Sequence, residues 1–300
     1  MIIKGDYGIA KHAAVTALVL FSLTYADTQS DVNALTGNLH SRVVWREGCT
    51  GGNPWSGYGR AIKGFDSKTG QTTVIYDQPC LKSVIAAGGH RVLVTTAGLK
   101  LLVMDWDGSN RSELANGMVS DGWRDPATGA EYAIYRAGGA STGGGIYRVN
   151  LDNSSDKTKI YNGQEGHSVY PWFQLSADGK KAASYFPQGG SNGGIVTLPG
   201  GTRQMNEPGC WASMASDNSY RWFHLGTGSG HQNLTTIKNT QRIASVKVLP
   251  PGQSSGQIYD PRVAEGPEHG GVFFVLGGNY PRYNQNSNRV EIWLGKFNEA

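Results

Sequence analysis

The sequence of 300 residues is poor in charged side chains, which make up only 17% of it, and rich in glycine, with 43 residues. A helical bundle would be rich in Ala, Glu, Lys and Leu, so this balance excludes that class. Lys and Arg form no block and the formal net charge is only +4, which gives no support for nucleic-acid binding. Glycines with Thr, Val, Tyr and Trp between them instead predict short strands joined by tight turns.

The sequence also lacks the short motifs that mark common catalytic and metal sites. It contains no H-x-H, H-E-x-x-H or C-x-x-C. Helices are not expected, so no helix N-terminus is expected to hold an anion. We therefore expect no cofactor, and no spacing of metal-ligating residues in the sequence supports a divalent metal site.

Long apolar runs are absent except near the start of the chain. Lys4 and Lys11 precede an apolar run of 11 residues, 13–23, and residues 24–26 follow it where a signal peptidase would cut. Such a run is too short to cross roughly 30 Å of hydrocarbon as a helix, although a short membrane anchor is the alternative. We predict a signal peptide at 1–26, a secreted or periplasmic protein, and no membrane span.

Only three cysteines occur, Cys49, Cys80 and Cys210. An exported chain can hold a disulfide, and we predict a Cys49–Cys80 bond because these two residues flank the first repeat described below. Closing a loop of this size would stabilise the fold by roughly 3–4 kcal/mol in the chain-entropy model. Three buried thiols are the alternative.

What the sequence does contain is a repeat. A polar turn with Asp178-Gly179 lies between two hydrophobic stretches, and the same order returns at 214–225 and, more weakly, at 86–96, 123–136 and 263–276. Asp-Gly and Gly-Gly supply the positive φ angles that two-residue hairpin turns require. A second set of turns follows downstream, spaced by 40 to 59 residues, with markers at Asp66, Asp107, Asp152, Pro199, Asn239 and Asn298.

Four strands and two hairpin turns per unit predict the blade of a β-propeller. We expect an all-β fold of six four-stranded blades over residues 40–300, with a two-sheet sandwich as the alternative. Neighbouring blades must stack face to face around an axis, because one blade cannot bury both its faces. The final strand, 290–298, has no outer neighbour, and we expect the segment 27–39 to supply the strand that closes the ring.

Particular turns carry a family resemblance. Residues 176–180 and 215–219 resemble the SPDG hairpin of the TolB-type propeller repeats, and 102–110 is similar to the outer hairpin of those repeats. The resemblance covers 40–298 loosely, and Pro-Gly-Gly at 199–201 departs from it. It implies a six-bladed propeller but little about activity, since such repeats occur in binding proteins, peptidase accessory domains and polysaccharide lyases.

One face of a propeller is the expected binding surface. The loops that enter the innermost strands, and those that join the second strand to the third, open there around the axis. Exposed aromatic rings suit the C–H face of a sugar, and Asn, Arg and Asp suit its hydroxyls, although packing between blades is the alternative for the tryptophans. The residues that we expect to bind a ligand are His40, Trp55, Trp172, Trp211, His231, Asp260, Tyr280, Arg282 and Tyr283.

Three functions fit these features. We favour a non-catalytic protein that binds carbohydrate or a cell-surface glycan. A lyase acting on a uronate polymer is the alternative, with a His or Tyr base that removes the α-proton and an Arg that neutralises the carboxylate. Its residues would be His167, Tyr170, Tyr259 and Arg262. A scaffold that docks a protein partner through the same face is the third.

Overall fold

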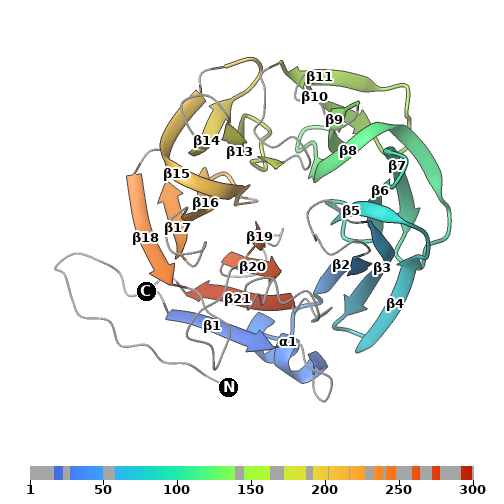
Figure 1. Ribbon diagram of the computed structural model, residues 1–300, viewed down its shortest axis with the longest axis horizontal. Helices are drawn as coiled ribbons and strands as arrows, with labels where there is room; N and C mark the ends of the chain where they lie inside the picture. The colour runs from blue at the N-terminus through green and yellow to red at the C-terminus, as the bar shows by residue number, and fades with distance from the viewer. Residues whose placement is uncertain are drawn as a thin grey trace.

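The computed structural model describes residues 17–22, 28–49, 58–138, 145–162, 172–186, 192–201, 203–215, 217–226, 233–238, 241–247, 259–263, 272–277 and 292–298. Within these ranges it contains strands β1 to β21 and a single helix, α1 (Thr28–Thr36). No helix of the described part is long and apolar enough to cross a membrane. The strands are arranged in sets around a common axis, so that the molecule forms a disc (Figure 1).

Each set consists of antiparallel strands, which follow one another along the chain except that β1 joins the last set. The first set contains β2 (Arg42–Cys49), β3 (Gly59–Asp66) and β4 (Gln71–Tyr76), and the second contains β5 (Cys80–Ile85), β6 (Arg91–Thr96), β7 (Lys100–Asp105) and the first half of β8 (Ser112–Arg124). The third contains the second half of β8 with β9 (Glu131–Ala137), β10 (Ile146–Asn150) and β11 (Lys157–Tyr161), and the fourth contains β12 (Phe173–Leu175), β13 (Lys181–Phe186), β14 (Asn192–Thr197) and the first half of β15 (Arg203–Met214). The fifth contains the second half of β15 with β16 (Arg221–Gly226), β17 (Asn233–Lys238) and β18 (Gln241–Lys247), and the sixth contains β19 (Tyr259–Val263), β20 (Val272–Gly277) and β21 (Ile292–Asn298) with β1 (Ala17–Ser22).

Strands β8 and β15 each cross from one set into the next. The first half of β8 pairs with β7, and from Gly117 onward it pairs with β9. Likewise β15 leaves β14 and pairs with β16 from Gly209 onward. A side chain at Gly117 would collide with the carbonyl oxygen of Arg136, and one at Gly209 would collide with the ring of His224. Glycine is required at both crossings because neighbouring atoms approach the backbone so closely.

The hydrophobic core lies between neighbouring sets. One cluster joins Leu93 and Leu101, from β6 and β7, to Val119 and Tyr135, from β8 and β9. Equivalent clusters lie between the first and second, the third and fourth, and the fourth and fifth sets. Face-to-face packing of this kind around an axis is the architecture of a β-propeller. The predicted all-β fold and its propeller-like arrangement are therefore confirmed. The hydrogen-bonded sheets do not close on themselves.

The segment 27–39 does not form the strand that we predicted there. Residues Thr28–Thr36 form α1, with Val32, Leu35 and Thr36 buried on one side. The spacing of these three residues matches the period of a helix rather than the alternation of a strand, which explains the difference.

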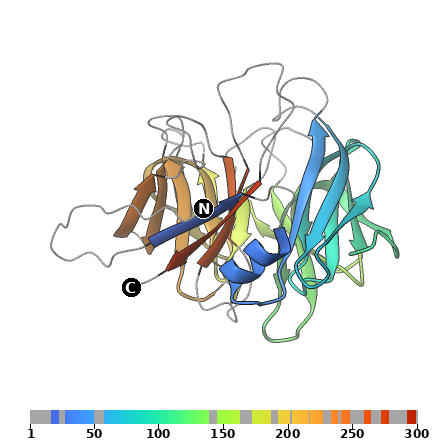
Figure 2. The same ribbon diagram turned by 90° about the horizontal axis from the view of Figure 1, so that it is seen from below.

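The outer neighbour of β21 is β1. Their antiparallel pairing runs from Ala17 opposite Asn298 to Ser22 opposite Trp293. Helix α1 follows and lies beside these two strands at the rim of the disc (Figures 1 and 2). Gln29 of α1 donates a hydrogen bond from Nε2 to the Ser67 carbonyl oxygen at 2.9 Å. The N-terminal part of the chain therefore connects the last set of strands to the first.

The strand register brings the two cysteines of the predicted disulfide to the same level of the sheet. Cys49 of β2 and Cys80 of β5 both lie opposite Gly59 of β3. The Cys80 side chain is buried, and its Sγ lies 3.7 Å from the Gly59 carbonyl oxygen. The side chain of Cys49 lies outside the described residues, so the disulfide stays a prediction.

Candidate functional site

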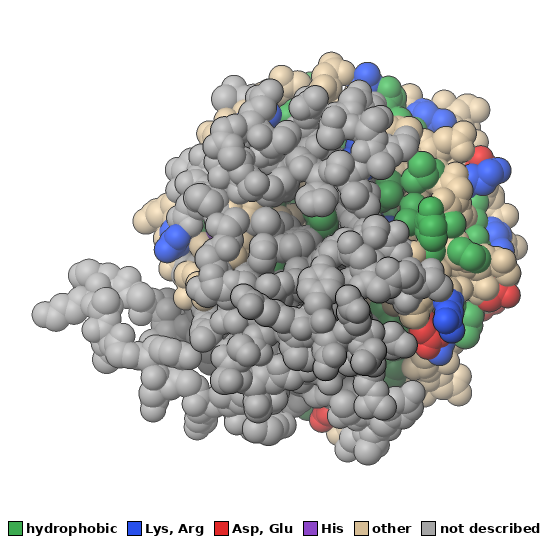
Figure 3. Space-filling view, in the orientation of Figure 1, with side chains coloured by type: hydrophobic (Ala, Val, Ile, Leu, Met, Phe, Trp, Pro, Cys, Tyr) green, Lys and Arg blue, Asp and Glu red, His purple; other side chains and the backbone are tan. Residues whose placement is uncertain are grey.

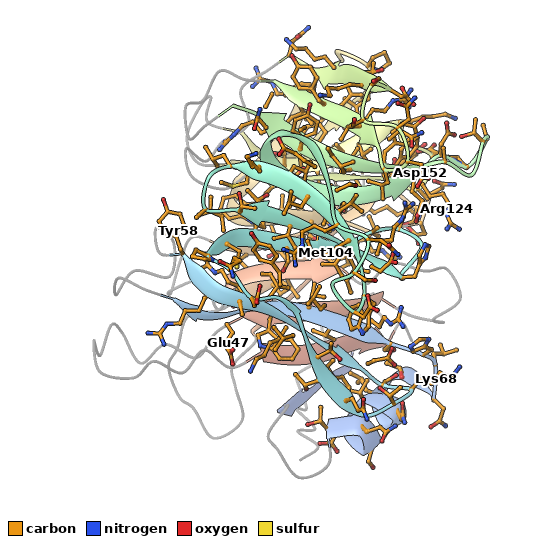
Figure 4. The ribbon with its side chains drawn as sticks, turned by 90° about the vertical axis from the view of Figure 1, so that its right-hand side faces the viewer. Glu47, Tyr58, Lys68, Met104, Arg124 and Asp152 are labelled. Atoms are coloured by element: carbon orange, nitrogen blue, oxygen red, sulfur yellow. The ribbon has the colours of Figure 1, made fainter. Side chains whose placement is uncertain are left out.

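The connections between strands divide the disc into two faces. We call one the turn face: short turns join the strands there, such as 86–90 between β5 and β6. The other is the loop face, where longer segments begin and end, such as 50–58 between β2 and β3 and 278–291 between β20 and β21. Figure 4 labels residues on opposite sides of the disc, with Lys68, Arg124 and Asp152 on the turn face and Glu47 and Tyr58 on the loop face.

His40 lies on the turn face, although we predicted it on the binding surface. Its Nε2 lies 2.8 Å from Oδ1 of Asp66, the last residue of β3 before the turn to β4. Arg42 donates from Nε to Oδ2 of Asp66 at 2.8 Å, and from Nη1 to the Gly89 carbonyl oxygen at 2.7 Å. These contacts tie β2 to two turns of the turn face, and they give His40 a structural role.

The wrong assignment of His40 came from counting β2 as an innermost strand. His40 comes shortly before β2, which begins at Arg42, much as His90 comes before β6, which begins at Arg91 and is the second strand of its set. The chain before β2 is therefore equivalent to a hairpin turn rather than to a loop that enters an innermost strand.

Lowering the pH is expected to weaken this contact in a defined window. Burial alone would raise the pKa of Asp66, but hydrogen bonds from Arg42, His40 and the Lys68 amide outweigh it and lower the pKa from 3.8 to about 2. The carboxylate therefore stabilises the fold above about pH 4, and this contribution, about 2 kcal/mol, is lost between about pH 4 and pH 2. In urea unfolding, the free energy of unfolding of Asp66→Asn should therefore fall by about 2 kcal/mol less than that of the wild type between about pH 4 and pH 2. The control is Asp77→Asn, on the exposed segment before β5, which should behave like the wild type.

The innermost strands, which border the axis, carry a β-bulge at the same place in several sets. The pairing of β5 with β6 shifts at Leu81, and that of β8 with β9 shifts at Ser120. Equivalent shifts lie between Cys210 and Ser213 in β15, and between Tyr259 and Arg262 in β19. A bulge turns side chains away from the regular alternation and is common beside binding sites. Two predicted ligand-binding residues, Trp211 and Asp260, lie within these bulges.

Polar side chains connect the second set to the third, the third to the fourth and the fourth to the fifth. Thr95 accepts a hydrogen bond through Oγ1 from the Val119 amide at 2.9 Å. Asp121 accepts through Oδ2 from the Leu175 amide at 2.9 Å. Gln174 accepts through Oε1 from the Met214 amide at 3.2 Å and from the Ser213 hydroxyl. Since all the accepting side chains are buried, these bonds satisfy polar groups inside the disc and fix the distance between neighbouring sets.

Trp172 is buried, with 6% of its surface exposed. Its neighbours include Met118 and the partly exposed Leu81 and Leu99. The ammonium group of Lys82, from the bulged part of β5, lies 5.9 Å from the centre of the Trp172 ring. This burial favours the packing role for Trp172 over that of an exposed platform for a sugar. Figure 3, which looks onto the loop face, shows hydrophobic side chains gathered over β5 to β8.

The remaining predicted residues fall into two groups. The structure gives the backbone position of Trp211 on β15 and of Tyr259, Asp260 and Arg262 on β19, close to the axis. The others lie outside the described residues: Trp55, His167, Tyr170, His231, Tyr280, Arg282 and Tyr283. No group of His, Cys, Asp and Glu in the described part of the chain could hold a metal ion.

Sequence reasoning missed the polar residues of the innermost strands. Lys82, Asp121, Gln174 and Ser213 each lie within a hydrophobic stretch, directly before or in the strand that leads into a hairpin turn. Lys82 and Asp121 lie four residues before the turns that begin at 86 and 125, whereas Gln174 and Ser213 lie two residues before those that begin at 176 and 215. The repeat therefore offered no single offset that identifies them.

Comparisons with known proteins agree with the fold and give no family. No protein-family model matches the chain, and no curated protein matches it significantly. Among solved structures, TolB from Acinetobacter baumannii superposes with a TM-score of 0.55 at 12% identity, covering 89% of this chain and 67% of TolB. A gluconolactonase from Xanthomonas campestris gives a TM-score of 0.52 at 14% identity, covering 92% and 94%.

A protein of unknown function from Bacteroides thetaiotaomicron gives a TM-score of 0.56 at 12% identity, covering 95% of this chain and 77% of its own. At these identities the similarity concerns the fold alone. The chain is TolB-like in its fold, and its function must be argued from its own residues.

Proposed function

We propose that this chain is an exported propeller of six blades, the first with three described strands, that binds carbohydrate on its loop face. The observation that carries the proposal is the bulge that recurs in the innermost strands. It brings Trp211 on β15 to a place around the axis equivalent to that of Tyr259, Asp260 and Arg262 on β19, although the two strands are far apart in the sequence. Tyrosine, tryptophan, arginine and aspartate are the side chains that suit sugar rings and their hydroxyls.

The contrast between the two faces supports this choice of surface. On the turn face, charged side chains are engaged with one another, as Arg91 is with Glu131 and Asp152 at 2.5 Å each. The turns of that face are short and close on their own backbone, for example from the Gly89 amide to the Ala86 carbonyl oxygen at 2.8 Å. The segments of the loop face are longer, and long loops on a rigid scaffold are where binding residues concentrate.

The proposal is tested by direct binding to polysaccharides. We expect the wild-type chain to bind at least one of a panel of neutral and acidic polysaccharides, measured by isothermal titration calorimetry. Arg262→Ala is expected to weaken this binding about 10- to 100-fold, the effect of removing a charge-assisted hydrogen bond. Lys180→Ala is the matched control, because Lys180 is an exposed cation of the turn face, and it should bind like the wild type.

The absence of binding to every polysaccharide by a folded chain would contradict the proposal. Equal losses in Arg262→Ala and Lys180→Ala would also contradict it, because the loop face would then have no special part in binding. Circular dichroism of both variants checks that each is folded.

A lyase is the second candidate, because Tyr259 and Arg262 flank a single bulge in β19. Tyrosine would serve as the base, and arginine would neutralise a uronate carboxylate. Incubation with alginate, pectate or ulvan decides between the two functions. A new ultraviolet absorbance from an unsaturated product, lost in Tyr259→Phe, would make the protein a lyase; binding without product supports the first proposal.

A further inference from the structure

The strand at the outer edge of the last set belongs to the predicted signal peptide. Residues 17–22, which form β1, lie inside the apolar run 13–23, before the predicted cleavage position after Ala26. All six residues of β1 pair with β21, from Ser22 opposite Trp293 to Ala17 opposite Asn298. One short segment therefore has two possible uses, as the apolar part of a leader and as a strand of the propeller.

Cleavage of the leader would remove the outer partner of β21. Among the described strands, β21 would then keep only β20 as a neighbour, paired from Val272 opposite Phe297 to Gly277 opposite Ile292. The amide and carbonyl groups along its other edge would lose the partners that β1 gives them. An edge of this kind pairs readily with any further strand that reaches it.

We propose that, once the leader is cleaved, the β21 edge is a docking site for an extended, uncharged, apolar segment of a partner protein. The inference depends on the predicted cleavage and is independent of carbohydrate binding on the loop face. The partner strand would lie antiparallel to β21 over the length that β1 occupies, and main-chain hydrogen bonds would supply its affinity, as in other cases of strand addition.

The occupant of the edge in the intact chain defines the chemistry of the partner. The six residues of β1, ALVLFS, contain no charge and no proline, and all of them take part in the pairing. A second copy of the chain would fit less well, because its own edge strand, IWLGKFN, carries Lys296. Lysine on an edge strand is a common protection against pairing with a copy of the same strand.

The experiment begins with the folded full-length chain, so that folding without the leader is not required. A specific protease site is introduced within residues 23–27, the protein is cut after it has folded, and the N-terminal fragment is removed by gel filtration. The probe is a fluorescent synthetic peptide of residues 15–24, and its binding is followed by anisotropy. A second peptide with proline in place of Val19 serves as the control, because proline cannot continue a hydrogen-bonded ladder.

We expect no binding to the uncut chain, whose own β1 occupies the edge, and saturable binding to the cut chain. The proline peptide should bind roughly tenfold more weakly or worse, the equivalent of one or two lost hydrogen bonds. Light scattering and circular dichroism are measured on the same samples. Dimers of the cut protein would overturn the proposal, since the edge would then pair with its own copy. A folded monomer that binds neither peptide, or a cut chain that unfolds, would overturn it as well.

Discussion

Replacing Arg91 by alanine is expected to lower the free energy of unfolding by about 3–5 kcal/mol. Arg91 begins β6 and spans two sets on the turn face: Nη2 lies 2.5 Å from Oε2 of Glu131, and Nη1 lies 2.5 Å from Oδ1 of Asp152. Only 6% of the Glu131 side chain is exposed. Removing the guanidinium leaves this carboxylate buried, with the Arg124 guanidinium at 3.5 Å and the His90 ring at 3.9 Å.

An exposed ion pair provides the control for Arg91. Lys100 and Glu113 form a 2.7 Å contact with about half of each side chain exposed, and Lys100→Ala should change stability by less than about 1 kcal/mol. Adding Glu131→Gln to Arg91→Ala should recover part of the loss, because the uncompensated charge is then gone. Equal effects of Arg91→Ala and Lys100→Ala in urea unfolding would show that the buried contact is absent.

Replacing Trp222 by alanine is the second change with a large expected effect, about 3–5 kcal/mol. Trp222 of β16 is fully buried, in a cluster with Ala183 and Ile195 of the preceding set. Truncation removes apolar contacts from both sets and leaves a cavity between them that strands fixed by their own hydrogen bonds cannot close.

Thermal and urea unfolding of Trp222→Ala are compared with those of Ile243→Ala. Ile243 lies on the outer strand β18 with 49% of its surface exposed, so its truncation should cost less than about 1 kcal/mol. A small effect of Trp222→Ala would mean that these two sets do not pack face to face through this residue.

The propeller could be predicted from the sequence because its turns repeat and its strands are hydrophobic throughout. Asp178-Gly179 closes a hairpin between β12 and β13, as expected, and Gly179 has a positive φ of 68°. Strands buried on both sides, such as β9 with its buried run from Glu131 to Arg136, lack the alternation of a one-sided sheet. Turn residues and the hydrophobicity of a strand are local properties, so they can be recognised in the sequence without knowing which distant segments are in contact.

The features that the sequence did not reveal depend on contacts between distant segments. The partner of His40 is Asp66, and nothing near His40 in the sequence indicates it. The bulges of the innermost strands arise from register, which a strand pattern does not fix to a single residue. The use of 17–22 as a strand was hidden because an apolar run suits a leader and a strand equally well.

The central claim is that the second to fifth sets of strands are tied to one another in succession around one axis, and native-state hydrogen exchange of three amides tests it most directly. The amides of Val119, Leu175 and Met214 donate to side chains of the preceding set, those of Thr95, Asp121 and Gln174. We predict that all three exchange only on global unfolding, and that Thr95→Val accelerates Val119 without affecting Met214. Rapid exchange of these amides in the folded wild-type protein would contradict the account.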